Sequence, residues 1–261
     1  MRNPFRRMPT ARALVVVLLT HPVELHDRVV GTWERVREAP APFLEAPVRL
    51  AVDAGHQAIG AEDCDSCEAE LHETRMAVSS RLPGPYHHDG GAALAEILWV
   101  IVRHRRPTTV VETGVARGVS TAFILDAMTR NGLGHLWSID LPPLDTPAAE
   151  VGIAVDEPLR TRWTYIRGAS RRKLRPLAVQ VGTLDLFVHD GLHTTRTMLD
   201  EMRTVWPHLN ESGLIVCDDA GYSSAVVQFC EEVATEPFLA RAADKDDVVA
   251  VILRHGTRRR A

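Results

Sequence analysis

Acidic and imidazole side chains follow an apolar segment near the middle of the chain, and they are of the kinds that transfer protons. Asp190 and His193 stand three residues apart in FVHDGLH. An imidazole titrates near neutral pH, so we expect His193 to act as a general base with Asp190 beside it in a catalytic site. The alternative is a surface histidine at the start of a helix.

A second group of carboxylates, Asp218 and Asp219, follows the next apolar segment in LIVCDDA. In an open parallel sheet, strand ends of this kind meet along one edge, so Asp190 is expected nearby. Carboxylates crowded together repel unless a positive charge lies between them, and oxygen ligands suit Mg²⁺. The sequence therefore predicts a divalent-metal site at Asp190, Asp218 and Asp219. The alternative is that these carboxylates cap helices or position a water.

The segment VVETGVARGVS, residues 110–120, is typical of a ligand-binding turn between a strand and a helix. Gly114 permits a tight turn, Gly118 lets backbone or ligand approach without a Cβ in the way, and the helix that Ser120 opens presents free amides. The pattern E-x-G-x-x-x-G-x-S differs from the G-x-G-x-x-G fingerprint of dinucleotide-binding proteins. Glu112 is an acid suited to an ammonium group, so the loop favours a ligand with an amino-acid moiety.

Alternating strands and helices must position these residues. Short apolar strands separated by helices indicate a parallel sheet covered on both faces, and two late strands around 244–247 indicate an antiparallel pair. The predicted strands are 109–112, 136–140, 163–167, 184–189, 214–218, 238–242 and 248–254. The predicted helices after residue 91 are 92–104, 120–130, 170–179, 194–206 and 223–235.

Asp140 ends the second predicted strand, where an acid can accept hydrogen bonds from ribose hydroxyls. The ordered set VVETGVARGVS, LWSID, YIRGAS, FVHDGLH and LIVCDDA resembles class I S-adenosylmethionine-dependent O-methyltransferases, above all the catechol-type enzymes and the bacterial enzymes with a DGxH signature. The resemblance covers residues 82–254. It implies a Rossmann-like α/β fold with a mostly parallel seven-stranded sheet.

The resemblance also implies roles for individual residues. His193 aligns with the catalytic base, which is a lysine in the catechol enzymes, and Asp190, Asp218 and Asp219 align with the metal ligands. Asp219 replaces an amide there, and Arg171 replaces a polar residue. The residues expected to line the S-adenosylmethionine site are Glu112, Gly114, Gly118, Ser120, Asp140, Gly168, Ala169, Ser170 and Asp190.

The expected reaction is methylation of a hydroxyl on a small-molecule acceptor. Loops near Tyr86, His87, His88 and Tyr222 are the expected substrate contacts. An N-methyltransferase or a sugar methyltransferase of the same fold remains open. A nicotinamide-dependent oxidoreductase is disfavoured by the glycine spacing, and a non-catalytic binding module by the intact set of acids and His193.

Composition sets the outer limits. The 261 residues carry a formal net charge of -4, with 45% hydrophobic and 25% charged residues, so a globular cytoplasmic protein without nucleic-acid or membrane partners is expected. Basic clusters at 103–106, 171–175 and 258–260 are interpreted as solvated helix ends and a tail. We expect an N-terminal helical extension (1–83), a methyltransferase domain (84–256) and a basic tail (257–261).

The N-terminal extension offers two further patterns. An amphipathic helix is predicted over 10–37, with Leu14, Val17, Leu18, Leu25 and Val29 on one face, and this face makes a homodimer plausible. Cys64-x-x-Cys67, with His56 and His72 nearby, has the spacing of a zinc half-site, but a single CxxC is a weak signal for a zinc site. Cys217 and Cys230 are expected in the core.

Overall fold

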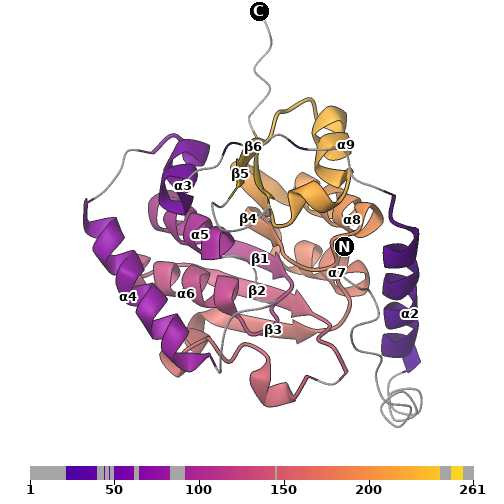
Figure 1. Ribbon diagram of the computed structural model, residues 1–261, viewed down its shortest axis with the longest axis horizontal. Coiled ribbons are helices and arrows are strands. Elements are labelled where there is room, and N and C mark those ends of the chain that lie inside the picture. The colour runs from indigo at the N-terminus through magenta and orange to yellow at the C-terminus, as the bar shows by residue number, and fades with distance from the viewer. Residues whose placement is uncertain are drawn as a thin grey trace, which may run out of the picture.

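A seven-stranded sheet organises the molecule. The structure, a computed structural model, describes residues 22–39, 44, 47, 50–61, 65–82, 92–144, 146–241 and 248–254. The strand order is β3-β2-β1-β4-β5-β7-β6, so the order reverses between β1 and β4 (Figure 1). The strands are β1 (Thr109–Thr113), β2 (His135–Asp140), β3 (Trp163–Arg167), β4 (Leu184–His189), β5 (Leu209–Cys217), β6 (Phe238–Arg241) and β7 (Val248–Leu253).

The pairing confirms the predicted fold class. Strands β1 to β5 run parallel, whereas β7 is antiparallel to both β5 and β6. All seven predicted strands are present, with ends that differ by a few residues. Residues 244–247, between the two late strands, lie outside the described residues.

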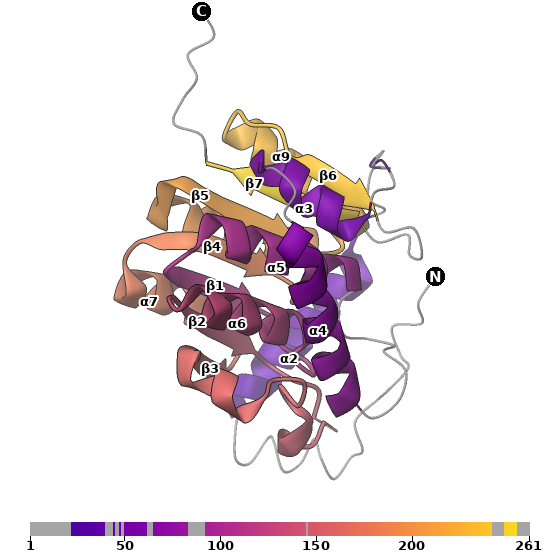
Figure 2. The same ribbon diagram turned by 90° about the vertical axis from the view of Figure 1, so that its left-hand side faces the viewer.

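Helices cover both faces of the sheet (Figure 2). Alternate strand residues enter opposite cores: Val110 packs with α5 and α6, while Val111 packs with α7, α8 and α9. Because both faces are covered, the strands are apolar on both sides. The helices are α2 (Pro22–Arg37), α3 (Ala51–Ile59), α4 (Asp65–Arg81), α5 (Ala92–Arg105), α6 (Val119–Asn131), α7 (Ser170–Val181), α8 (Thr195–Val205) and α9 (Ala225–Glu232), with short 3₁₀ turns at Ala148–Glu150, Glu157–Arg162, Trp206–His208 and Ala220–Tyr222.

The described part of the N-terminal extension divides into two places. Helices α3 and α4 lie with α5 and α6, whereas α2 stands apart at the side toward which β1, β2 and β3 point (Figure 1). The predicted residues Leu14, Val17 and Leu18 lie outside the described residues, as does the tail 257–261. None of the described helices has the length and apolar character needed to cross a bilayer.

Helix α2 packs through polar residues. Asp27 and Glu34 are its buried residues, whereas Val29, Trp33 and Val36 are 60%, 46% and 63% exposed. Val29, Trp33 and Val36 thus form an apolar stripe that faces away from the rest of the described structure. What attaches the helix to the molecule is its opposite, charged face.

Candidate functional site

Gly114 brings the turn after β1 against the turn after β4. Its backbone has φ +89°, and a Cβ added there would lie 1.9 Å from the carbonyl oxygen of Asp190. Gly118 has φ +83° and leaves 2.8 Å between an added Cβ and Gly152 Cα. Both glycines therefore have the steric role expected from the sequence, and Gly114 places the loop next to Asp190.

Glu112 is completely buried, and its carboxylate already has three hydroxyl partners. Ser120 Oγ donates to Oε1 over 2.8 Å, and Thr121 Oγ1 and Ser138 Oγ donate to Oε2 over 2.8 Å and 2.7 Å. Burial raises the pKa of Glu112 to about 7, against the opposite effect of these hydrogen bonds. The structure therefore gives Glu112 a role in fixing the loop between β1, α6 and β2, in addition to any contact with a ligand.

Asp140 ends β2 beside the same loop. Its Oδ2 accepts a hydrogen bond from the Ala116 amide at 3.2 Å. Burial raises the pKa of Asp140, although backbone amides favour the charged form. The Gly168 amide donates to the Asp140 carbonyl at 2.8 Å. The segment predicted to bind adenine, which begins at Gly168, therefore lies directly beside the predicted ribose-binding acid.

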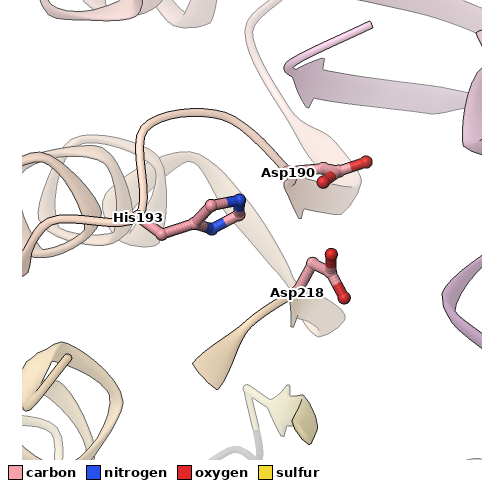
Figure 3. Close-up of side chains that lie close together, drawn as sticks. All are labelled: Asp190, His193 and Asp218. Carbon is pink, nitrogen blue, oxygen red and sulfur yellow. The ribbon is translucent and has the colours of Figure 1, made fainter. Parts of the chain in front are cut away.

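Acidic side chains meet at the ends of β4 and β5. Ligand atoms of Asp190, His193 and Asp218 all lie within 4.8 Å of one another, and the His193 ring points toward the two carboxylates (Figure 3). The pKa of Asp190 is raised because the group is buried and because Asp218, Glu112 and Asp219 place negative charge around it. A cation between Asp190 and Asp218 would relieve this repulsion.

The structure divides the predicted metal ligands differently from the sequence. Among the described residues, the group whose ligand atoms converge contains His193 in place of Asp219. Asp219 Oδ2 instead lies 3.7 Å from His193 Nε2. Asp219 adopts a left-handed backbone with φ +50°, which turns its side chain along a different path from that of Asp218.

A buried pair behind His193 was missed by the sequence analysis. His189 Nδ1 lies 2.7 Å from Glu201 Oε2, and Thr113 Oγ1 donates to the same oxygen over 2.7 Å. The His189 and His193 rings are nearly perpendicular, with centroids 5.2 Å apart. The signal for this pair was a histidine within an apolar strand and a glutamate on the apolar face of α8.

Helix α2 contacts the loops that carry the predicted ligand-binding residues. Asp27 forms ion pairs with Arg171 and Arg172 at the start of α7. Glu34 accepts hydrogen bonds from Thr194 and Thr197. The interpretation of residues 171–175 as a solvated helix end is therefore incomplete, because Arg171 and the exposed Arg172 also pair with Asp27 of α2.

More contacts of α2 extend along the same edge of the sheet. Arg28 donates to the Pro142 carbonyl over 2.7 Å, two residues after Asp140. A Cβ added to Gly31 would lie 3.3 Å from Leu192, within the Asp190–His193 turn. Helix α2 thus spans the turns after β2 and β3, which are expected to bind the donor, and the turn after β4, which carries Asp190 and His193.

The predicted substrate contacts have different outcomes. Tyr222 is 45% exposed, in the turn that follows Asp219. Tyr86, His87 and His88 lie outside the described residues. Cys217 and Cys230 are buried, as expected.

A family comparison matches the part of the chain that contains this site. Residues 111–220 match the model of the family described as "Methyltransferase domain". The match begins within β1 and ends just after Asp219, so it includes the glycine turn and the acids at the strand ends. No curated protein matches the chain.

Solved structures share the fold at low sequence identity. The O-methyltransferase of Bacillus cereus in complex with SAH is 15% identical, with a TM-score of 0.50 over 78% of this chain and 97% of that chain. TomG of Streptomyces achromogenes, an O-methyltransferase in complex with SAM, is 15% identical, with a TM-score of 0.51 over 79% of this chain and 96% of that chain. The cofactor-bound Rv0187 of MTB is 17% identical, with a TM-score of 0.52 over 81% of this chain and 100% of that chain.

Proposed function

We propose that this chain, whose residues 111–220 match the methyltransferase-domain model, transfers a methyl group from S-adenosylmethionine to a hydroxyl of a small molecule. The observation that carries the proposal is the meeting of two features at one sheet edge. The glycine turn after β1 packs against Asp190, and Asp190 lies beside His193 and Asp218. A donor cradle is thus next to groups that can handle an acceptor proton.

The donor would occupy the turns after β1, β2 and β3. S-adenosylmethionine, when bound, supplies a methyl group already activated on a sulfonium. Gly114 and Gly118 let the turn pack closely against the Asp190 carbonyl and Gly152, and the N-terminal amides of α6 would be available to the donor's carboxylate. Asp140 would accept hydrogen bonds from the ribose hydroxyls, and Gly168, Ala169 and Ser170 would line the adenine. The SAM and SAH bound to two of the similar structures support this choice of donor.

His193 is the proposed general base. Methyl transfer is an in-line displacement, so the protein must hold the acceptor and remove its proton. The Asp219 carboxylate, 3.7 Å from Nε2, would favour the imidazolium that forms when His193 takes that proton. His189 packs its ring at right angles to His193 and is itself held by Glu201.

Asp190 and Asp218 fit a divalent cation such as Mg²⁺. Their carboxylates converge, and the raised pKa of Asp190 indicates negative charge that a cation would neutralise. A cation held there would supply a positive charge that makes an acceptor hydroxyl more acidic. In this proposal the two carboxylates bind the cation, and His193 removes the proton of the acceptor. Asp219, the third ligand expected from the sequence, would orient His193.

The test combines donor binding with turnover. We expect His193→Ala to bind S-adenosylmethionine with the wild-type Kd in calorimetry, yet to lose at least about 100-fold in turnover of phenolic and catecholic acceptors, the scale of a general base. His72→Ala, at an exposed position on α4, is the matched control. Full turnover by His193→Ala would refute the assignment of the base. Binding of NAD in place of S-adenosylmethionine would refute the proposed class.

Removal of the cation is a separate arm. Turnover that falls on addition of EDTA and returns with Mg²⁺ is expected, and Asp218→Asn should need more Mg²⁺ for half-maximal turnover. Equal turnover with and without EDTA would contradict the cation site but leave His193 untouched. Amine and sugar acceptors in the same assay distinguish the N-methyltransferase and sugar methyltransferase alternatives.

A further inference from the structure

The proposed base His193 packs against a second histidine, to which the proposed reaction gives no role. His189 ends β4, and its ring lies at right angles to the His193 ring, with the two centroids 5.2 Å apart. This is an edge-to-face arrangement of the kind that aromatic rings prefer. His189 is fully buried, whereas the side chain of His193 is 24% exposed. The His189 ring is thus an interior surface on which the partly exposed ring of His193 rests.

Glu201 of α8 fixes the orientation of the His189 ring. Its side chain is 1% exposed, and its Oε2 lies 2.7 Å from His189 Nδ1. An ionised carboxylate only accepts hydrogen bonds, so Nδ1 is the donor of this contact. The same oxygen accepts a second hydrogen bond, from Thr113 Oγ1 over 2.7 Å. The ring is therefore held by a carboxylate that is itself held in place.

The position of Glu201 connects it to both halves of the proposed site. Thr113 and His189 are register partners at the ends of β1 and β4. The residues that follow them are Gly114 of the donor turn and Asp190 of the acidic edge. One oxygen of Glu201 therefore joins the two strand ends from which both turns leave.

A purely structural role does not account for this pair. Replacement of a buried charged pair by apolar residues of similar volume is often neutral or stabilising, so a core does not require such groups. Among the described residues, nothing hydrogen bonds to Glu201 Oε1 or to His189 Nε2, although both atoms are buried. Buried polar atoms are normally satisfied, and the exceptions call for an explanation such as a role in catalysis.

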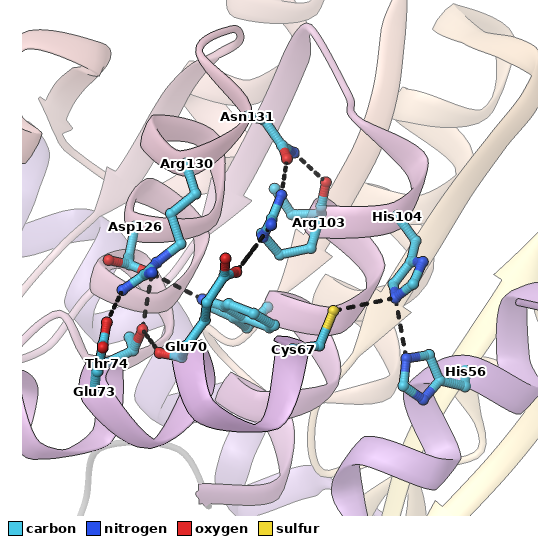
Figure 4. A network of polar contacts seen from close by, with 12 residues as sticks. His56, Cys67, Glu70, Glu73, Thr74, Arg103, His104, Asp126, Arg130 and Asn131 are labelled. Atoms are coloured by element: carbon cyan, nitrogen blue, oxygen red, sulfur yellow. Dashed lines mark hydrogen bonds and ion pairs between the residues drawn. The ribbon is translucent and has the colours of Figure 1, made fainter. Parts of the chain in front are cut away.

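The polar network between α4, α5 and α6 provides a contrast (Figure 4). There Asp126 Oδ2 accepts hydrogen bonds from Thr74 and Arg130, each over 2.8 Å. None of these three described side chains has a buried polar atom that lacks a partner. Fastening α4 to the sheet domain accounts for that network, whereas the pair of His189 and Glu201 keeps two open atoms.

We propose that Glu201 and His189 are positioning residues for His193. Glu201 fixes the His189 ring through its hydrogen bond. That ring in turn holds His193 beside the two carboxylates of the proposed cation site. The inference rests on the proposed role of His193 as general base. A displacement of a reacting group by about 1 Å can cost about 100-fold in rate, so loss of this support should be measurable.

Methyl-transfer kinetics of the full-length chain test the proposal. Glu201→Ala should lower kcat by about 10- to 100-fold, with a smaller change in the KM for S-adenosylmethionine. Glu201→Gln should recover most of the kcat, because its amide oxygen can accept the hydrogen bond from Nδ1. Leu199→Ala removes another buried side chain from α8, so it controls for lost packing and should keep the wild-type kcat.

Three kinetic results would overturn the proposal. They are a wild-type kcat in Glu201→Ala, an equal loss of kcat in Glu201→Gln or Leu199→Ala, and an effect that falls mainly on KM. The double variant His189→Leu with Glu201→Leu provides a test that does not depend on the folding of Glu201→Ala. It should unfold at a denaturant concentration near that of wild type, since the pair becomes apolar, and yet lose kcat as Glu201→Ala does. Wild-type kcat in this folded variant would also refute the proposal.

Histidine NMR tests the same contacts without turnover. In protein labelled with ¹⁵N-histidine, the Nδ1 proton of His189 should be protected from solvent exchange and shifted downfield by its carboxylate partner. The His193 ring signals, assigned with His193→Ala, should shift in Glu201→Ala but not in Leu199→Ala. Unchanged His193 signals in Glu201→Ala would refute the support of His193 by this pair. The expected shifts in a chain that transfers no methyl group would instead refute the proposed function.

Discussion

At the scale of single residues, Gly114 joins the donor turn to the acidic edge. An alanine there must move the Asp190 carbonyl, which an added Cβ would approach to 1.9 Å. We expect Gly114→Ala to lose measurable S-adenosylmethionine binding in calorimetry and to lose more stability than a matched glycine. Gly132→Ala is that match: its φ is +70°, but the added Cβ meets nothing within 4 Å, so it should cost about 1 kcal/mol for backbone strain. Equal donor affinity in both variants would contradict the steric argument.

Glu112 predicts a pH dependence of stability. The folded state keeps its proton up to about pH 7, whereas the ordinary pKa is 4.5, so the folded state binds more protons between these values. The contribution of this group to the free energy of unfolding therefore falls as pH rises through that window, by about 3 kcal/mol. Glu112→Gln lacks this titration, so denaturant unfolding should show wild-type stability falling relative to the variant from pH 4.5 to 7. Wild-type and Glu112→Gln stabilities that change in parallel with pH would contradict this prediction. The exposed Glu236→Gln controls for the loss of one carboxylate.

At the scale of elements, α2 is held by charge more than by apolar packing. Burial raises the pKa of Asp27, but the hydrogen bonds and charges of Arg171 and Arg172 outweigh it and hold the pKa below its usual value. Asp27→Asn should destabilise the fold by about 1 to 3 kcal/mol, because two arginines lose a charged partner that is 4% exposed. Hydrogen exchange of residues 22–37 should accelerate, whereas exchange in β1 should change little. The exposed Asp53→Asn is the control, and unchanged exchange in α2 would rule out this role of Asp27.

The face through which α2 packs on the rest of the molecule was not predictable from its sequence pattern. Periodicity identified a helix with an apolar stripe, and that stripe includes Val29, which faces outward. Hydrophobic pattern predicts which face a helix buries when apolar packing dominates. Here the partners of Asp27 and Glu34 are more than 140 residues away in the chain, so no local pattern could show that the charged face is the buried one.

At the scale of the whole molecule, donor binding should stabilise the fold. A ligand that binds the folded state alone adds about 2.7 kcal/mol at 100 times its Kd. S-adenosylmethionine should therefore raise the Tm in a thermal-shift titration, whereas NAD should leave it unchanged. A shift with NAD alone would contradict the proposed class.

The homodimer remains a prediction for the whole molecule. It rests on the outward stripe of Val29, Trp33 and Val36. Light scattering should give a dimeric mass for wild type and a monomeric mass for Trp33→Glu. A monomeric wild type would contradict it.

The sequence by itself determined the strand and helix order, the glycine turn, and the acids at the ends of β4 and β5. These depend on local patterns: apolar runs, glycine at strand ends, and short spacings such as that from Asp190 to His193. Tertiary structure decided that Asp219 lies beside His193, that α2 docks through its charges, and that His104 lies beside His56. The two histidines are 48 residues apart. Their contact depends on how closely α3 packs on α5, which is a property of the assembled core and not of either segment.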